Sequence, residues 1–103
     1  MRIEVRGQDS ISHQARTYAE YRVFAALTQS TDTEKVRRVR VQLRPLVPGR
    51  GSGGIACTVM VEWEGLDSLR IRTTGPHAYA AINRAVERIR ANAAAGTEDR
   101  VFG

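Results

Sequence analysis

A cluster of basic side chains between residues 35 and 50 is the feature of this sequence most able to take part in binding chemistry. The cluster has no acidic member and consists of Lys35, Arg37, Arg38, Arg40, Arg44 and Arg50. Charges elsewhere nearly balance, so this stretch supplies the whole formal excess of +5. Guanidinium groups suit phosphate oxygens, and such an excess predicts an acidic partner such as nucleic acid. A run of this kind is also typical of a solvated strand face or loop.

Patterns for a cofactor or a metal are weak. Gly49, Gly51 and Gly54 match G-x-G-x-x-G. A dinucleotide site needs that motif between a strand and a helix, whereas here it leads into a predicted strand. We interpret it as a flexible hairpin loop. His13 and His77 fall at the starts of two predicted helices, with no cluster of further ligands. We therefore expect no cofactor, no metal and no small-molecule substrate.

Three residues have side chains that could act in catalysis, but a structural role explains each of them better. They are Cys57, Glu62 and Glu64. Cys57 alternates with inward-facing apolar residues, which predicts a buried thiol and not a reactive one. Glu62 and Glu64 are expected on one face of a strand, where an open surface gives neither burial nor the separation of pKa values that acid and base catalysis requires. We predict that they form ion pairs across the sheet with neighbouring arginines, namely Arg40, Arg70 or Arg72. The sequence predicts a protein that is not an enzyme.

The length and composition predict one domain in a reducing compartment. A chain of 103 residues, 42% of them hydrophobic, is the size of a single domain. No apolar run is long enough to span a membrane, and the start of the chain alternates where a secretory signal would be continuously apolar. Cys57 is the only cysteine, so no internal disulfide can form. We expect a cytoplasmic domain over residues 1–95, followed by a flexible tail over residues 96–103.

Two periodicities predict the elements that position these residues. Alternating apolar residues indicate strands over residues 1–6, 38–44, 57–64 and 69–73. Apolar residues at spacings of three and four indicate helices from Ser10 or Ser12 to Thr28 and from Pro76 to about Gly96. Residues 45–54 contain two prolines and four glycines, which predicts a mobile loop, and Pro45 is expected to end the second strand.

The order βαβββα predicts an α+β fold with a four-stranded mixed sheet. A right-handed crossover makes strands one and two parallel, and the remaining pairs are antiparallel. Each helix has one apolar stripe, so both helices are expected to pack on the same face of the sheet. Trp63 and Tyr79 could stack on nucleobases, but their apolar stripes predict that they belong to the core. The other face of the sheet is expected to be exposed to solvent or to contact a partner. It is lined by Arg2, Arg6, Arg38, Arg40, Arg70 and Arg72.

Several strings resemble the ribosome hibernation-promoting factor family in its short form, also called ribosome-associated inhibitor or sigma-54 modulation protein. The string HAYAAINRAVERI, residues 77–89, is similar to that family's last helix. Supporting strings are MRIEVRG, ARTYAEYRVFAAL, VRRVRVQL and CTVMVEWEG. The resemblance covers about residues 1–93. One departure is the end of the last helix, which is usually rich in lysine in the family and is nearly neutral here, as ANAAAGTEDR.

The resemblance implies a protein that binds rRNA of the small ribosomal subunit, in the channel used by mRNA and tRNA, and lowers translation under stress. By the same resemblance the rRNA-binding residues are Arg84 and Arg88 on the second helix and Arg16 and Arg22 on the first, followed by Arg38 and Arg40 of the second strand. We expect a monomer or weak homodimer without membrane contact. The alternative is a protein-interaction or regulatory module on the same fold, in which the arginine face meets an acidic protein.

Overall fold

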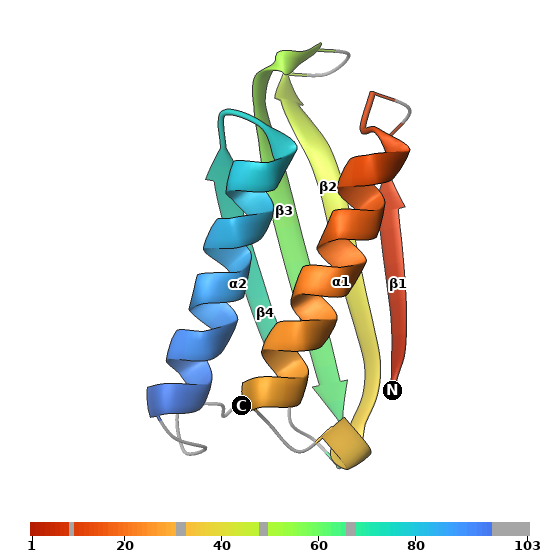
Figure 1. The fold of residues 1–103 in the computed structure, drawn as a ribbon, viewed down its shortest axis with the longest axis vertical. Helices are drawn as coiled ribbons and strands as arrows, with labels where there is room; N and C mark the ends of the chain where they lie inside the picture. Colours follow the sequence, from red (N-terminus) through yellow and green to blue (C-terminus); the bar gives the residue numbers. More distant parts are fainter. Residues whose placement is uncertain (9, 31–32, 48–49, 66–67, 96–103) are drawn as a thin grey trace.

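A four-stranded mixed sheet forms one layer of the molecule. The computed structural model describes residues 1–8, 10–30, 33–47, 50–65 and 68–95. The strands β1 (Arg2–Gly7), β2 (Val36–Val47), β3 (Arg50–Trp63) and β4 (Ser68–Gly75) lie side by side in that order. The pair β1 and β2 is parallel, and the other pairs are antiparallel (Figure 1). The predicted order βαβββα and the predicted sheet are confirmed. The tail predicted over residues 96–103 lies outside the described residues.

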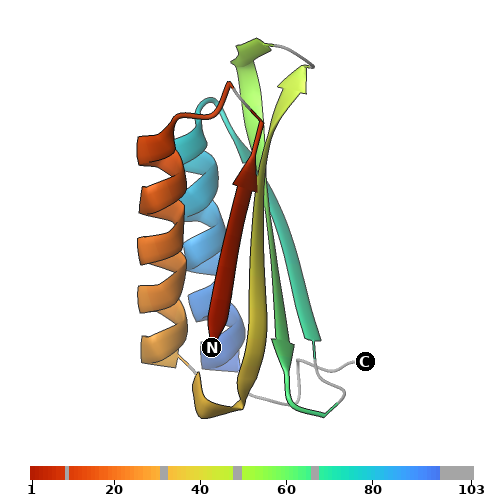
Figure 2. The same ribbon diagram turned by 90° about the vertical axis from the view of Figure 1, so that its right-hand side faces the viewer.

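Two helices form the second layer, and both pack on the same face of the sheet (Figure 2). Helix α1 (His13–Ser30) begins after Ser12, whose hydroxyl accepts a hydrogen bond from the Ala15 amide at 3.1 Å. Such a cap satisfies one of the free amides of the first turn. Helix α1 continues two residues beyond the predicted end at Thr28, and a short 3-10 turn, η1 (Thr33–Lys35), leads into β2.

Helix α2 (Ala78–Ala95) is held against β4 by a close backbone contact. Gly75 ends β4, and a Cβ atom there would lie 2.7 Å from the Ala81 amide nitrogen. The Thr73 hydroxyl donates a hydrogen bond to the Ala81 carbonyl at 2.7 Å. The helix starts two residues later than Pro76, because His77 caps it by accepting a hydrogen bond from the Ala80 amide at 3.2 Å.

The core lies between the two layers and contains the inward-facing residues of both. Those of β2 and β3 are fully buried, and so are the stripes of the two helices. Trp63 belongs to this core, as predicted. Tyr79 does not, because its side chain is 38% exposed. The ring of Tyr18 fills the place between the helices, and Tyr79 packs on its outer side with the ring centroids 4.9 Å apart.

The loop predicted over residues 45–54 is largely a continuation of the hairpin between β2 and β3. Pro45 pairs with Ile55, and Val47 pairs with Arg50, with an irregular register between Pro45 and Val47. Proline does not end β2, because the pairing of β1 with β2 stops at Leu43. Beyond that point one side of β2 is an open edge, where a missing amide hydrogen is tolerated. Gly51 and Gly54 of the glycine motif lie in β3 and open no helix, whereas residues 48 and 49 lie outside the described residues.

Candidate nucleic-acid interface

The sheet face that the helices leave uncovered carries the outward-pointing side chains of all four strands, and we call it the open face. Figure 2 shows this face on the side away from both helices. Strand alternation places Ile3 and Val5 against the core and sends their neighbours to the opposite side. The pairing then builds rows across the sheet, such as Arg2 beside Arg38 beside Glu62, and Arg40 beside Met60 beside Arg70.

The open face carries a large positive charge. Within the described residues it bears two glutamates, Glu4 and Glu62, and seven arginines, which are Arg2, Arg6, Arg38, Arg40, Arg44, Arg70 and Arg72. Its net charge is therefore +5, equal to that of the whole chain. The strand alternation thus joins Arg38, Arg40 and Arg44 of the 35–50 cluster to arginines of β1 and β4 on one face.

Most of these guanidinium groups have no acidic partner. Among the described side chains of the open face, Arg6 pairs with Glu4 at 3.7 Å. The predicted ion pairs of Glu62 and Glu64 with arginines of β2 and β4 do not form. Glu62 lies opposite Arg38 and Ser68, and Glu64 follows the end of β3, where its amide bonds to the Lys35 carbonyl at 2.7 Å. The arginines thus stay available for an external anion.

The second-helix arginines lie beside the edge strand β4. A depression of about 660 Å³ runs along this edge and is lined by Arg72, Thr73, Thr74, Arg84, Glu87, Arg88 and Ala91. The Arg84 side chain donates a hydrogen bond to the Thr74 carbonyl at 2.6 Å, which anchors it at the strand. Arg72 lines this depression and also a hollow on the open face, whose lining includes Gln42 and Thr58. Arg84 and Arg88 therefore continue the basic surface around the edge of the sheet.

One continuous band thus unites four of the six predicted site residues, and we call it the arginine surface. A second depression, lined by Arg6, Arg40 and Met60, adjoins the hollow on the open face and shares Gln42 and Thr58 with it. The arginine surface consists of Arg38, Arg40, Arg44, Arg70, Arg72, Arg84 and Arg88. Arg44, Arg70 and Arg72 were absent from the predicted site, although the alternation of their strands was sufficient to place them there.

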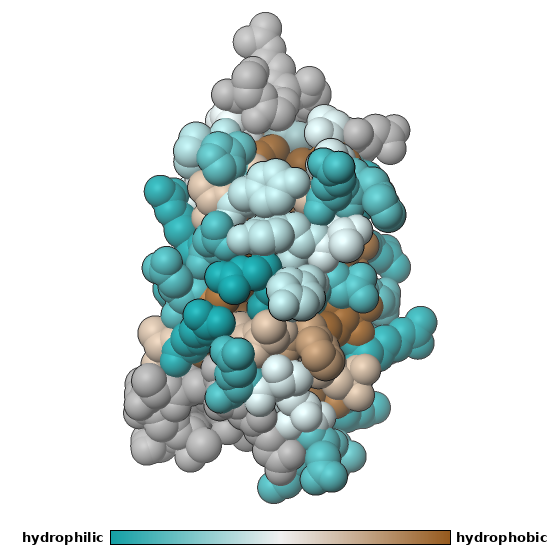
Figure 3. Space-filling view, viewed as in Figure 1, coloured by the Kyte–Doolittle hydropathy of each residue, from teal (hydrophilic) through white to brown (hydrophobic). Residues whose placement is uncertain are grey.

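The two remaining predicted residues lie elsewhere. Arg16 is half-buried near the end of β1 and donates a hydrogen bond to the Gln8 carbonyl at 3.1 Å. Arg22 lies on the helix layer, with its guanidinium carbon 6.0 Å from the centre of the Tyr18 ring. Figure 3 shows this side of the molecule, where hydrophilic and less polar residues are interspersed. The structure does not bring Arg16 and Arg22 to the arginine surface.

Cys57 and Tyr18 lie away from the arginine surface and contribute to the packing of the fold. Cys57 is fully buried in the core, and burial raises the pKa of its thiol to about 12. Tyr18 spans the two helices by donating a hydrogen bond to Asn83 Oδ1 at 2.6 Å. The described residues contain no group of three or more His, Cys, Asp or Glu side chains that could hold a metal ion. None of the described helices is long and apolar enough to cross a membrane.

Comparison with solved structures defines the fold class. A ribosomal subunit interface protein from Coxiella burnetii is similar to this chain with a TM-score of 0.72 and 11% sequence identity, over 92% of this chain and 96% of that one. The N-terminal domain of Protein Y from Thermus thermophilus is similar with a TM-score of 0.63 and 21% identity, over 89% and 91% of the two chains. No protein-family model and no curated protein matches the sequence. The two structures confirm the fold that the resemblance to hibernation-promoting factors implied.

Proposed function

We propose that this protein binds rRNA of the small ribosomal subunit through the arginine surface and thereby lowers translation. The observation that carries the proposal is the uncovered sheet face with a net charge of +5, joined at its edge to Arg84 and Arg88. One solved protein of the same fold is named as a ribosomal subunit interface protein. A ribosome-bound role of this kind is cytoplasmic and requires no catalysis.

The geometry favours contacts to the phosphate backbone over the reading of base sequence. Arginines on neighbouring strands of a sheet lie roughly 5 Å apart, and those on alternate residues of one strand lie roughly 7 Å apart. Such a grid of long cationic side chains can follow phosphates of a folded RNA in many registers. Phosphate contacts orient a protein on nucleic acid but carry little sequence information. Specificity for rRNA would then come from the shape of the subunit channel.

Co-sedimentation with purified small ribosomal subunits tests the proposal at low and moderate salt. The wild-type protein is expected in the subunit pellet at low salt and to be released as the salt concentration rises. The variant Arg84→Glu/Arg88→Glu reverses two charges at the end of the arginine surface and is expected to bind much less. Arg90→Glu is the control on the same helix, because Arg90 contacts Gln29 of α1 and lies outside the arginine surface. Absence of the wild-type protein from the pellet at low salt would contradict the proposal.

An acidic protein is the alternative partner for the same surface. Pull-down from a lysate with and without nuclease separates the two cases, because an RNA-mediated complex is lost on digestion while a direct protein complex persists. A partner that survives nuclease and needs the arginines of β2 would favour the protein-interaction module over the rRNA-binding protein.

A further inference from the structure

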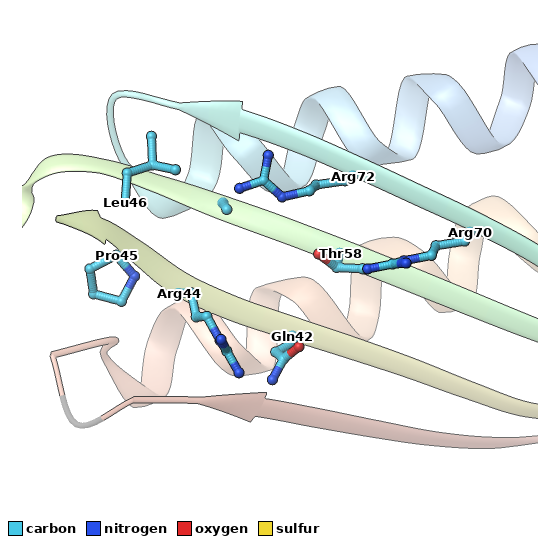
Figure 4. A pocket seen from close by; sticks show the side chains of 8 residues that line it. Gln42, Arg44, Pro45, Leu46, Thr58, Arg70 and Arg72 are labelled. Atoms are coloured by element: carbon cyan, nitrogen blue, oxygen red, sulfur yellow. The ribbon is translucent and has the colours of Figure 1, made fainter. Parts of the chain in front are cut away.

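The open face is hollowed over the middle of β3, where this strand carries small side chains. Ala56 and Thr58 form the floor, and longer residues of the two neighbouring strands form the walls. The hollow measures about 220 Å³ and is lined by Gln42, Arg44, Pro45, Leu46, Ala56, Thr58, Arg70 and Arg72. Figure 4 shows Arg70 and Arg72 extending from β4 over β3, with Arg44 and Gln42 on the β2 side. Arg70 and Arg72 therefore bound the hollow from the β4 side, while the Arg44 side chain extends from β2 toward β1.

The three arginines give this hollow a charge of +3 without an acidic side chain in its lining. No ion pair or hydrogen bond within the described residues engages their guanidinium groups. Glu4 lines only the adjoining depression and is paired with Arg6. Glu62 does not line the hollow and lies four residues from Thr58 along β3, diagonal to Arg70 of β4. Arg70 and Arg72 lie two residues apart on β4, so their like charges repel one another, and a multivalent anion would relieve that repulsion.

One end of the hollow is apolar. Leu46 is 44% exposed there, beside Pro45. The leucine reaches over β3 because Gly54, with a φ of 99°, has no side chain. A Cβ atom at Gly54 would lie 3.0 Å from Leu46 Cδ1. A ligand that combines a compact anionic group with an apolar or planar portion would match both ends of the hollow.

We propose that this hollow binds a free nucleotide through two adjoining phosphate groups. A nucleoside diphosphate carries about three negative charges, which matches the three arginines, and its phosphate oxygens suit the bidentate guanidinium fork. The Thr58 hydroxyl and the Gln42 amide can donate further hydrogen bonds. The sugar and base would pack on the exposed Leu46 side chain. At about 220 Å³ the hollow is smaller than a typical small-molecule pocket of roughly 300–1,000 Å³, so it would take the phosphate groups while the rest of the nucleotide stays outside it.

Nucleotide binding would also regulate the proposed function. Arg44, Arg70 and Arg72 belong both to the hollow and to the arginine surface, so a bound diphosphate neutralises three of the cations that rRNA would contact. A saturating nucleotide is then expected to weaken RNA binding. This regulatory step rests on the proposed function, whereas nucleotide binding itself does not.

Isothermal titration calorimetry with ADP, GDP, AMP and pyrophosphate tests the site, in a buffer free of phosphate and magnesium. ADP and GDP are expected to bind at least about tenfold more tightly than AMP, because AMP lacks the second phosphate. Pyrophosphate binding as tightly as ADP would assign the site to inorganic pyrophosphate or polyphosphate instead of a nucleotide. Equal affinity for AMP and ADP, or no binding of any diphosphate, would overturn the proposal.

Two variants and one control variant locate the site. Arg70→Gln/Arg72→Gln is expected to weaken ADP binding by roughly a hundredfold or more, since each lost charge-assisted hydrogen bond costs about tenfold. Arg37→Gln/Arg90→Gln removes the same charge outside the hollow and is expected to bind ADP as the wild type does. Thr58→Phe fills the hollow without removing charge and is expected to abolish binding. Thermal melts establish that each variant is folded. Full ADP binding by a folded Thr58→Phe variant would exclude the hollow.

Competition with RNA separates failure of the site from failure of the proposed function. ADP is titrated into a complex of the protein with a labelled rRNA fragment. Displacement by ADP but not by AMP supports both proposals. RNA binding without ADP binding overturns the nucleotide site alone, and ADP binding without RNA binding overturns the proposed function alone. ADP binding that leaves a stable RNA complex unaffected overturns the regulatory step.

Discussion

Neutralising two arginines of β2 should reduce the salt dependence of RNA binding by a predictable amount. Arg38 and Arg40 lie in neighbouring rows of the open face, and Arg38→Gln/Arg40→Gln lowers its net charge from +5 to +3. Each phosphate neutralised contributes roughly 0.7 to 0.9 to the slope of log K against log salt. The slope of the variant should therefore be shallower by about 1.4 to 1.8. Between 50 and 200 mM salt, the affinity advantage of the wild type should shrink roughly tenfold.

Fluorescence anisotropy with a labelled rRNA fragment, measured at five or six salt concentrations, gives both slopes. Arg16→Gln/Arg22→Gln is the matched control, because it removes the same charge at two positions away from the arginine surface. Its slope should stay within about 0.3 of the wild-type value, which is less than half of one phosphate contact. Equal losses in the two variants would refute the argument that the arginine surface, and not net charge, determines binding. A steeper loss in the control would move the interface to α1.

Three further predictions concern the scaffold. Gly75→Ala should lower the free energy of unfolding by roughly 1–3 kcal/mol in urea, because the new Cβ would lie 2.7 Å from a backbone nitrogen of α2; an unchanged midpoint would contradict this packing. The wild type should lose about 1.4 kcal/mol of stability per pH unit from pH 9 to about 12, relative to Cys57→Ala, because the unfolded thiol ionises first while the folded thiol keeps its proton. Below pH 9 the difference should be constant, and parallel profiles up to pH 12 would exclude the raised pKa. Tyr18→Phe should cost about 1 kcal/mol through its lost hydrogen bond to Asn83, and a double-mutant cycle showing no coupling would contradict that interaction.

Most of the fold was predictable from the sequence because periodicity determines which residues face the core. The alternation around Val39, Val41 and Leu43 placed their arginine neighbours on the open face, as the structure has them. Pro45 shows where local rules stop being sufficient. Its effect depends on whether another strand pairs beside it, and the length of β1 decides that question. Local composition therefore predicted a loop where tertiary structure extends a hairpin.

The strand residues of the site were predictable from the alternation of each strand, whereas the helix residues were harder to predict. Arg84 and Arg22 both occupy polar positions of amphipathic helices, and the sequence pattern does not separate them. Their difference depends on which neighbour each helix edge meets, which is β4 for Arg84 and the Tyr18 ring for Arg22. Tyr79 was misplaced for a similar reason, since the space beneath it is filled by Tyr18 of the other helix. The neighbour that a helix residue meets is determined by contacts between segments that are distant in the sequence, and the local pattern does not reveal it.

Mapping protein–RNA cross-links in the complex with small ribosomal subunits tests the central claim most directly. Ultraviolet irradiation followed by mass spectrometry identifies the peptides that contact rRNA. The arginine surface predicts cross-linked peptides from β2, β4 and the first half of α2, including those with Arg40, Arg70 and Arg84. Cross-links confined to α1, or cross-links to ribosomal proteins with none to rRNA, would contradict binding of rRNA through the open face.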